Sequence, residues 1–158
     1  MTVQNIVSFD PGLITGIATG RFSDDTPLEV VDVLAVPYNE WVEDRLFFKA
    51  MVENRGSYDH VVSEVFTSRT DNEFAPDLTG VRVEGILNLA FSERVIWRPR
   101  TKKEQVPDAV LRDNGIWYTG EQVEWSDGRD VNDAIIHMLG FVAFDLRHRP
   151  TLEKYFRG

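Results

Sequence analysis

Apolar residues along the chain gather in short runs that turn-forming residues separate. Residues 3–9, 15–22 and 28–38 are rich in β-branched and aromatic side chains, and short turns join them. They predict three antiparallel strands in a meander. Residues 58–66 and 95–97 predict two further short strands.

Helical segments alternate with the later strands. Residues 39–54 place large side chains on one face behind a polar start at Asn39, and residues 77–92 form a second, largely apolar helical stretch. Residues 130–144 are apolar almost all round, which predicts a buried helix. A meander followed by alternating helices and strands predicts an α/β fold with a mixed sheet.

One segment gives conflicting signals. Thr101 and Glu104 have the spacing of a capping box, in which each side chain satisfies a free backbone N–H at the start of a helix. Pro107 would then fall inside the helix, where it removes a hydrogen bond and clashes with the preceding turn. We expect a helix that is either kinked or starts later than the capping pattern indicates, and that ends at Gly115.

Size and composition are those of one globular domain. The chain has 158 residues, of which 42% are hydrophobic and 27% charged, enough for one hydrophobic core. We expect a single domain over residues 1–149 and a loose basic tail over residues 150–158. The chain has no Cys, no apolar run of bilayer length and no basic segment followed by an apolar one at its start. These features favour a cytoplasmic protein without a membrane partner.

The first turn of the chain carries a carboxylate. The expected strand over residues 3–9 runs into Asp10, and Pro11 and Gly12 turn the chain at once, because proline cannot donate to a central strand. Gly16 permits the close approach of another segment. An acid held beside a tight turn is suited to bind a metal or a phosphate, although Asp10 is equally well explained as a turn former.

Three further acids lie at the ends of apolar elements. Glu64 ends the expected strand around residue 62, and Asp130 and Asp133 lie three residues apart at the start of the buried helix, on one face. The helix dipole alone favours acids there, by roughly 0.3–1 kcal/mol each. Because the helix is buried, however, its acids are fixed at its beginning rather than spread over a wet surface.

Acids that share a site disfavour one another's ionisation unless cations neutralise them. Oxygen ligands without a histidine cluster or a cysteine favour Mg²⁺, with Mn²⁺ as a substitute, over zinc. Two such ions about 3.5–4 Å apart can activate a water and stabilise the leaving oxygen of a phosphodiester. The formal net charge of −9 argues against a nucleic-acid partner, but bound cations would reduce it. The acids therefore predict metal-dependent phosphodiester hydrolysis.

Three motifs, in this order, resemble those of the RuvC-type Holliday junction resolvases of the RNase H-like superfamily. They are FDPGLITG at residues 9–16, VVSEVF at residues 61–66 and RDVNDA at residues 129–134. The resemblance implies an RNase H-like α/β fold, with a mixed five-stranded sheet of three antiparallel and two parallel strands flanked by helices. The short stretch between residues 97 and 103 is similar to compact, phage-encoded members.

The resemblance also implies an activity and a partner. Such enzymes are homodimers, here paired through the helix of residues 77–92, that nick two strands of a four-way DNA junction symmetrically with two Mg²⁺ ions. Carried over one residue at a time, the catalytic and metal-binding acids are Asp10, Glu64, Asp130 and Asp133.

Residues near these motifs are candidates for contact with branched DNA, because basic clusters bind phosphates and an aromatic side chain can stack on an unpaired base. The candidates are Phe66, Arg69, Arg98, Arg100, Lys102 and Lys103. Phe66 is equally well explained as a core residue. His137, one turn beyond Asp133, either lines the site as an accessory residue or belongs to the core.

Other functional classes fit parts of the sequence. Actin-like ATPases and sugar kinases share the Asp-Pro-Gly turn followed by Thr-Gly, but they need two lobes and a much longer chain. A non-catalytic module that binds branched DNA gains nothing from negative charge facing phosphate. A broader RNase H-like nuclease that cuts flaps, other branches or hybrids stays open.

Overall fold

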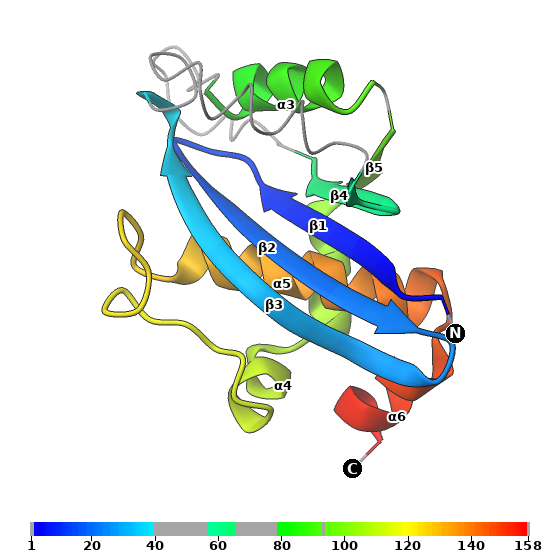
Figure 1. The fold of residues 1–158 in the computed structure, drawn as a ribbon. Helices are drawn as coiled ribbons and strands as arrows, with labels where there is room; N and C mark the ends of the chain where they lie inside the picture. Colours follow the sequence, from blue (N-terminus) through cyan, green and yellow to red (C-terminus); the bar gives the residue numbers. More distant parts are fainter. Residues whose placement is uncertain (1, 40–56, 66–78, 93, 158) are drawn as a thin grey trace.

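A five-stranded sheet forms the centre of the molecule in this computed structural model, which describes residues 2–39, 57–65, 79–92 and 94–157 (Figure 1). Its strands are β1 (Gln4–Asp10), β2 (Ile14–Ser23), β3 (Thr26–Pro37), β4 (His60–Glu64) and β5 (Val95–Arg98). They lie in the order β3-β2-β1-β4-β5. The first three strands pair antiparallel, β4 runs parallel to β1, and β5 runs parallel to β4. The predicted mixed sheet is confirmed.

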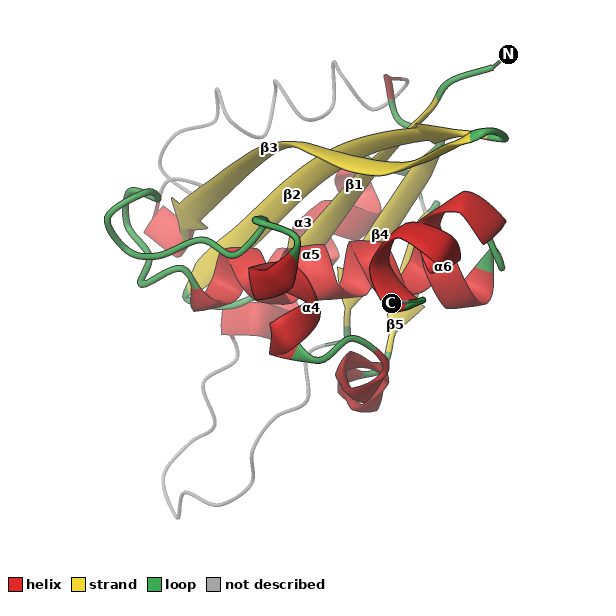
Figure 2. Ribbon diagram, turned by 90° about the horizontal axis from the view of Figure 1, so that it is seen from below, coloured by secondary structure: helices red, strands yellow, loops and turns green. Residues whose placement is uncertain are grey.

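Helices cover both faces of this sheet (Figure 2). They are α3 (Thr79–Ala90), the 3₁₀ helix η2 (Arg100–Gln105), α4 (Asp108–Asp113), α5 (Arg129–Gly140), the π-helical turn η3 (Phe141–Asp145) and α6 (Arg149–Phe156). None of the helices in the described part of the chain has the length and apolar character that crossing a membrane requires.

The sheet separates two hydrophobic clusters because successive side chains of a strand point to opposite faces. On β1, Ile6 packs in the cluster around α5, whereas Val7 and Phe9 pack in the cluster around α3. The central strands are thus buried on both faces, which explains why they read as continuous apolar runs.

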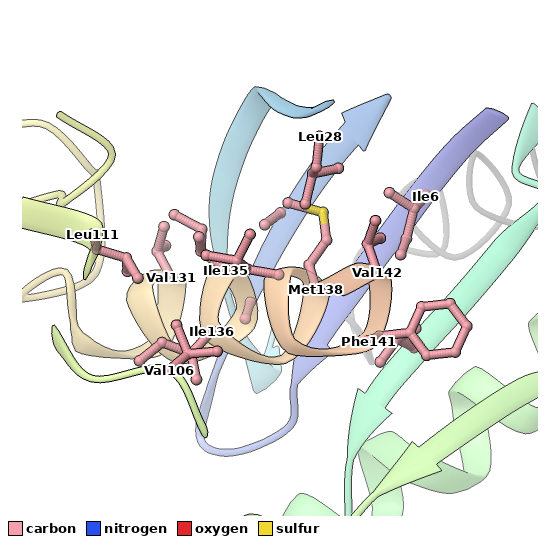
Figure 3. Close-up of a cluster of buried hydrophobic side chains, with 14 of the residues drawn as sticks. Ile6, Leu28, Val106, Leu111, Val131, Ile135, Ile136, Met138, Phe141 and Val142 are labelled. Atoms are coloured by element: carbon pink, nitrogen blue, oxygen red, sulfur yellow. The ribbon is translucent and has the colours of Figure 1, made fainter. Parts of the chain in front are cut away.

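Helix α5 lies against the sheet through most of its length (Figure 3). Ile135, Met138 and Val142 pack toward Ile6 and Leu28 of the strands. The prediction of a buried helix from residue 130 onward is confirmed, and the burial fixes the direction in which its first turns present their acids.

The capping box at Thr101 is not formed. The 3₁₀ helix η2 begins at Arg100 after Pro99, so Thr101 lies inside it, and no side chain caps its start. The α-helix α4 starts only after Pro107, which precedes its first residue, and Gly115 follows it with a positive φ of 69°. The expectation of a later helix start is therefore the correct one, because proline suits the start of a helix and not its interior.

The C-terminal residues form helix α6 rather than the loose tail that was expected. The backbone N–H of Leu28 donates to Thr151 Oγ1 at 2.9 Å, and Tyr155 Oη donates to the carbonyl of Leu28 at 2.8 Å. Both side chains are buried. The basic composition of the segment suggested a loose tail, and it gave no sign that Thr151 and Tyr155 attach the segment to β3.

One predicted element lies outside the described residues. It is the helix expected over residues 39–54, apart from its first residue.

Candidate metal centre

Three carboxylates from distant parts of the sequence meet at one edge of the sheet. Asp10 is the last residue of β1 and Glu64 the last residue of the neighbouring parallel strand β4. Asp133 lies in the second turn of α5, which contacts both of these strands. One oxygen of each carboxylate lies within 4.8 Å of the other two.

Gly16 allows α5 to approach the sheet this closely. It pairs with Asp10 in the β1–β2 ladder, and a Cβ at this position would overlap the backbone carbonyl of Asp130. Any larger residue would push the start of α5 away from β2. The Gly16 of the first motif is therefore what lets the acids of the third motif reach Asp10.

The electrostatics of the cluster are unbalanced. Burial, reinforced by the negative charges of Glu64 and Asp133, raises the pKa of Asp10 well above its ordinary value, and the smaller opposing effect of Lys103 does not offset this. Lys103 Nζ donates to Asp133 Oδ2 at 2.6 Å and forms an ion pair with Glu64 Oε2 at 2.9 Å. Within the described part of the chain, one ammonium thus faces three carboxylates, which is the charge pattern of a site that takes up further cations.

Glu64 is held from two sides. Its Oε2 accepts from Lys103 and lies 2.8 Å from His137 Nε2. Burial alone would raise the pKa of Glu64, but these two hydrogen bonds lower it below its ordinary value. Glu64 is therefore ionised in the fold and ready to act as a ligand.

Asp130 lies at the margin of the cluster, outside the group of three whose oxygens converge. Ser126 Oγ donates to its Oδ2 at 3.3 Å. Burial, with the charges of Asp127 and Asp133, raises the pKa of Asp130.

Arg98 has a different surrounding from the one expected of a DNA contact. Its side chain is 1% exposed. Its Nε donates to Asp145 at 3.0 Å, its Nη1 to the His137 carbonyl at 3.0 Å, and its Nη2 to Gln105 at 3.1 Å. All three nitrogens of the guanidinium are used inside the protein, so Arg98 does not present a donor to a phosphate at the surface.

The other residues predicted to contact DNA differ in their surroundings. Lys102 Nζ forms an ion pair with Asp145 at 3.0 Å, and Lys103 lies within the acid cluster. Arg100 is exposed at the start of η2 and makes no ion pair with another described residue. Phe66 and Arg69 lie outside the described residues.

A pocket of about 440 Å³ adjoins the acid cluster and shares Lys103 and Asp133 with it. Its other walls come from η2, α4, the loop before α5 and the first turn of α5. The basic and aromatic residues among them are Arg100, Arg112, Trp117, Tyr118 and Arg129. The guanidinium of Arg112 lies over the Trp117 ring, 4.3 Å from its centroid.

Asn132 attaches the loop of this pocket to α5. Its side chain accepts from the Tyr118 backbone N–H and donates to the Tyr118 carbonyl, both at 2.9 Å. Asn132 is 2% exposed. Sequence reasoning did not assign Asn132, Arg112 or Arg129; the only signal was a buried amide between the two acids of the third motif.

The residues present fit a hard divalent cation. The donors that converge are carboxylate oxygens, and the chain has no cysteine. Mg²⁺ and Mn²⁺ prefer such ligands, and the negative charge in excess of Lys103 would stabilise them there.

The fold has counterparts among solved structures. RuvC of Thermus thermophilus in complex with a Holliday junction substrate matches with a TM-score of 0.62 at 15% identity, over 93% of this chain and 98% of that one. The chain has the fold of RuvC. A second Thermus thermophilus RuvC structure matches with a TM-score of 0.60 at 16% identity, over 90% of this chain and 97% of the other. No protein-family model and no curated protein matches the sequence. The likeness seen in three motifs thus extends to the RuvC fold as a whole.

Proposed function

We propose that this protein is a metal-dependent endodeoxyribonuclease that resolves four-way DNA junctions by paired nicks. The observation that carries the proposal is the convergence of Asp10, Glu64 and Asp133 within 4.8 Å on a fold shared with RuvC. In a protein that only binds DNA, such negative charge facing the phosphates would lower the affinity for DNA.

Asp10, Glu64 and Asp133 would hold the metal, with Asp130 completing the set for a second ion. Two Mg²⁺ ions, or Mn²⁺ in their place, would when bound supply an activated water and stabilise the charge on the leaving oxygen. The protein's own part is to fix the carboxylates. Strand ends position Asp10 and Glu64, and the buried helix α5 positions Asp133. Lys103 keeps two of these carboxylates in place, and hydrogen bonds to both raise its pKa although burial acts to lower it.

The pocket beside the cluster is suited to the DNA next to the cut. Arg100 and Arg129 line it and make no ion pair with another described residue, so both remain able to bind phosphate. The half-buried rings of Trp117 and Tyr118 offer apolar surface to a sugar or base. In this proposal, the pocket residues contact the DNA in place of Arg98 and Lys102, two of the residues predicted from the sequence to contact DNA.

Paired nicks require two copies of the site, and α3 offers a surface for a second copy of this chain. Val81 and Leu89 are 48% and 72% exposed, and Gly85 between them has open space around it. Residues four apart share a helix face, so these three form an exposed apolar strip with a flat centre. A homodimer through α3 would bury it.

The test uses purified protein with synthetic four-way junctions, flaps and linear duplexes, with and without Mg²⁺. Symmetric nicks on the junction, absent without metal and absent in Asp10→Asn, support a resolvase. Cleavage of flaps and other branches at similar rates would instead support a broader debranching nuclease with the same site. Metal-independent binding without any cleavage would overturn the enzyme and favour a DNA-binding module.

A further inference from the structure

We infer that His137 and Arg98 are positioning residues for Glu64: the buried guanidinium sets the orientation of the imidazole, and the imidazole holds the Glu64 carboxylate for metal binding. This inference rests on the proposed metal site, and it goes beyond it by assigning a role to two residues outside the acid cluster.

The direction of the hydrogen bonds follows from the donors available. Arg98 Nη1 lies 3.3 Å from His137 Nδ1, and a guanidinium has only donors. His137 Nδ1 must therefore accept, which places the ring proton on Nε2. His137 Nε2 then donates to Glu64 Oε2 at 2.8 Å. The three residues form one directed series, from Arg98 through His137 to Glu64.

Burial makes this series specific. His137 is 0% exposed and Arg98 is 1% exposed, so water does not compete for either ring nitrogen. Rotating the imidazole by half a turn would place carbon atoms opposite Arg98 and Glu64 and leave both without these hydrogen bonds. Losing hydrogen bonds between buried groups is unfavourable, so the His137 ring is held in one orientation.

The guanidinium is itself fixed by several elements. Asp145 of η3 and Gln105 of η2 accept from it, as does the His137 carbonyl of α5. Arg98 and Glu64 are paired residues at the ends of β5 and β4. Gly140 leaves room for the guanidinium, because a Cβ there would lie 2.8 Å from Nη1. Helix α5 thus provides the histidine and, three residues on, the space that its arginine partner needs.

The consequence for Glu64 is a fixed carboxylate. His137 and Lys103 both hold Oε2, while no described residue forms a hydrogen bond with Oε1. Two bonds to one oxygen restrict rotation about the terminal bond of the side chain. A ligand that is already oriented loses less entropy when an ion binds, which is why partners of metal ligands affect metal affinity.

The experiment measures Mn²⁺ binding by calorimetry in the 158-residue chain, without DNA. His137→Leu removes both hydrogen bonds, whereas His137→Gln keeps an N–H that can reach Glu64. We expect the Mn²⁺ dissociation constant to rise about 10–100-fold in His137→Leu and to be largely restored in His137→Gln. Melting in EDTA verifies that each variant is folded.

A second variant alters the series without removing any polar group. Gly140→Ala introduces a methyl against the Arg98 guanidinium, in a helix that alanine favours over glycine. We expect about a tenfold loss of Mn²⁺ affinity. His60→Gln is the matched control, because His60 bonds to Gln4 Oε1, outside the site, and its exchange should leave Mn²⁺ affinity unchanged.

The outcomes separate this inference from the proposed function. Wild-type protein that binds no Mn²⁺ would overturn both. Wild-type affinity in folded His137→Leu would overturn only the positioning role, and so would equal losses in the leucine and glutamine variants, since packing alone would then explain them. If His137→Leu does not fold, an unchanged Mn²⁺ affinity in Gly140→Ala overturns the role, and a loss of affinity in that variant supports it.

Discussion

Two charged regions meet at His137, and they are built in opposite ways. On one side, Asp10, Glu64 and Asp133 face the ammonium of Lys103, which is the single cation that the described residues place among them. On the other side, Arg98 is surrounded by acceptors for each of its nitrogens. The first region has more negative than positive charge, whereas in the second region every guanidinium nitrogen has a hydrogen-bond acceptor.

The difference separates function from stability. A buried group whose partners are complete contributes to the fold, and removing it leaves those partners unsatisfied. A buried group whose charge is uncompensated weakens the fold, and such a group is typical of a binding site. Changes on the two sides should therefore have opposite effects on stability.

Asp10→Asn should have the largest effect on activity. Losing one ligand should slow Mg²⁺-dependent junction cleavage by about 10³-fold. The free energy of unfolding without metal should rise, because Asn avoids the burial and repulsion that raise the pKa of Asp10. Cleavage assays and urea denaturation in EDTA measure the two effects. Full activity in this variant would refute the metal site.

Arg98→Met should have the largest effect on stability. Removing the guanidinium leaves the acceptors of Arg98 without their donor, and we expect the free energy of unfolding to fall by about 3 kcal/mol. Arg100→Met, two residues along and exposed, should change it by no more than about 0.5 kcal/mol. Urea denaturation of both variants measures the difference. Equal values would mean that Arg98 is not the satisfied group that its contacts indicate.

Arg100→Ala and Arg129→Ala should weaken DNA binding without destabilising the fold. Each loss of a phosphate contact should lower the slope of log affinity against log salt by about one. Fluorescence anisotropy with a four-way junction in Ca²⁺ measures this. Arg21→Ala is the control, since Arg21 pairs with Glu29 outside the pocket. A slope that shifts equally in the control would place the DNA elsewhere.

Asp145→Asn should show the smallest effect, which is present near neutral pH and disappears in acid. Burial would raise the pKa of Asp145, but hydrogen bonds from Arg98 and Lys102 lower it below its ordinary value. The ionised Asp145 carboxylate therefore stabilises the fold at pH values above its pKa in the unfolded chain. This stabilisation is lost as the pH falls through the lower pKa that Asp145 has in the folded protein. In urea denaturation at pH 6, the free energy of unfolding of the wild type should exceed that of Asp145→Asn by about 1 kcal/mol. This difference should disappear below about pH 4. A gap that stays constant in acid would contradict the ion pair.

Much of the fold could be predicted from local patterns. The five strands and the buried helix α5 follow from apolar runs and their periodicity, which depend on nearby residues alone. Residue type and position at element ends also indicated Asp10, Glu64 and Asp133 as members of one site. The convergence of these three is seen in the structure, whereas their catalytic and metal-binding roles, and those of Asp130, Phe66 and Arg69, stay predictions.

Local sequence is enough to specify which elements form and which of them carry acids at their ends, because strand and helix periodicity and turn chemistry are local. What each charge faces depends on how those elements pack. Arg98 and Arg100 lie two residues apart and look alike in sequence, yet one is buried among acceptors and the other is exposed. That contrast depends on the pairing of β5 with β4 and on the space at Gly140, both set by residues far apart in the chain.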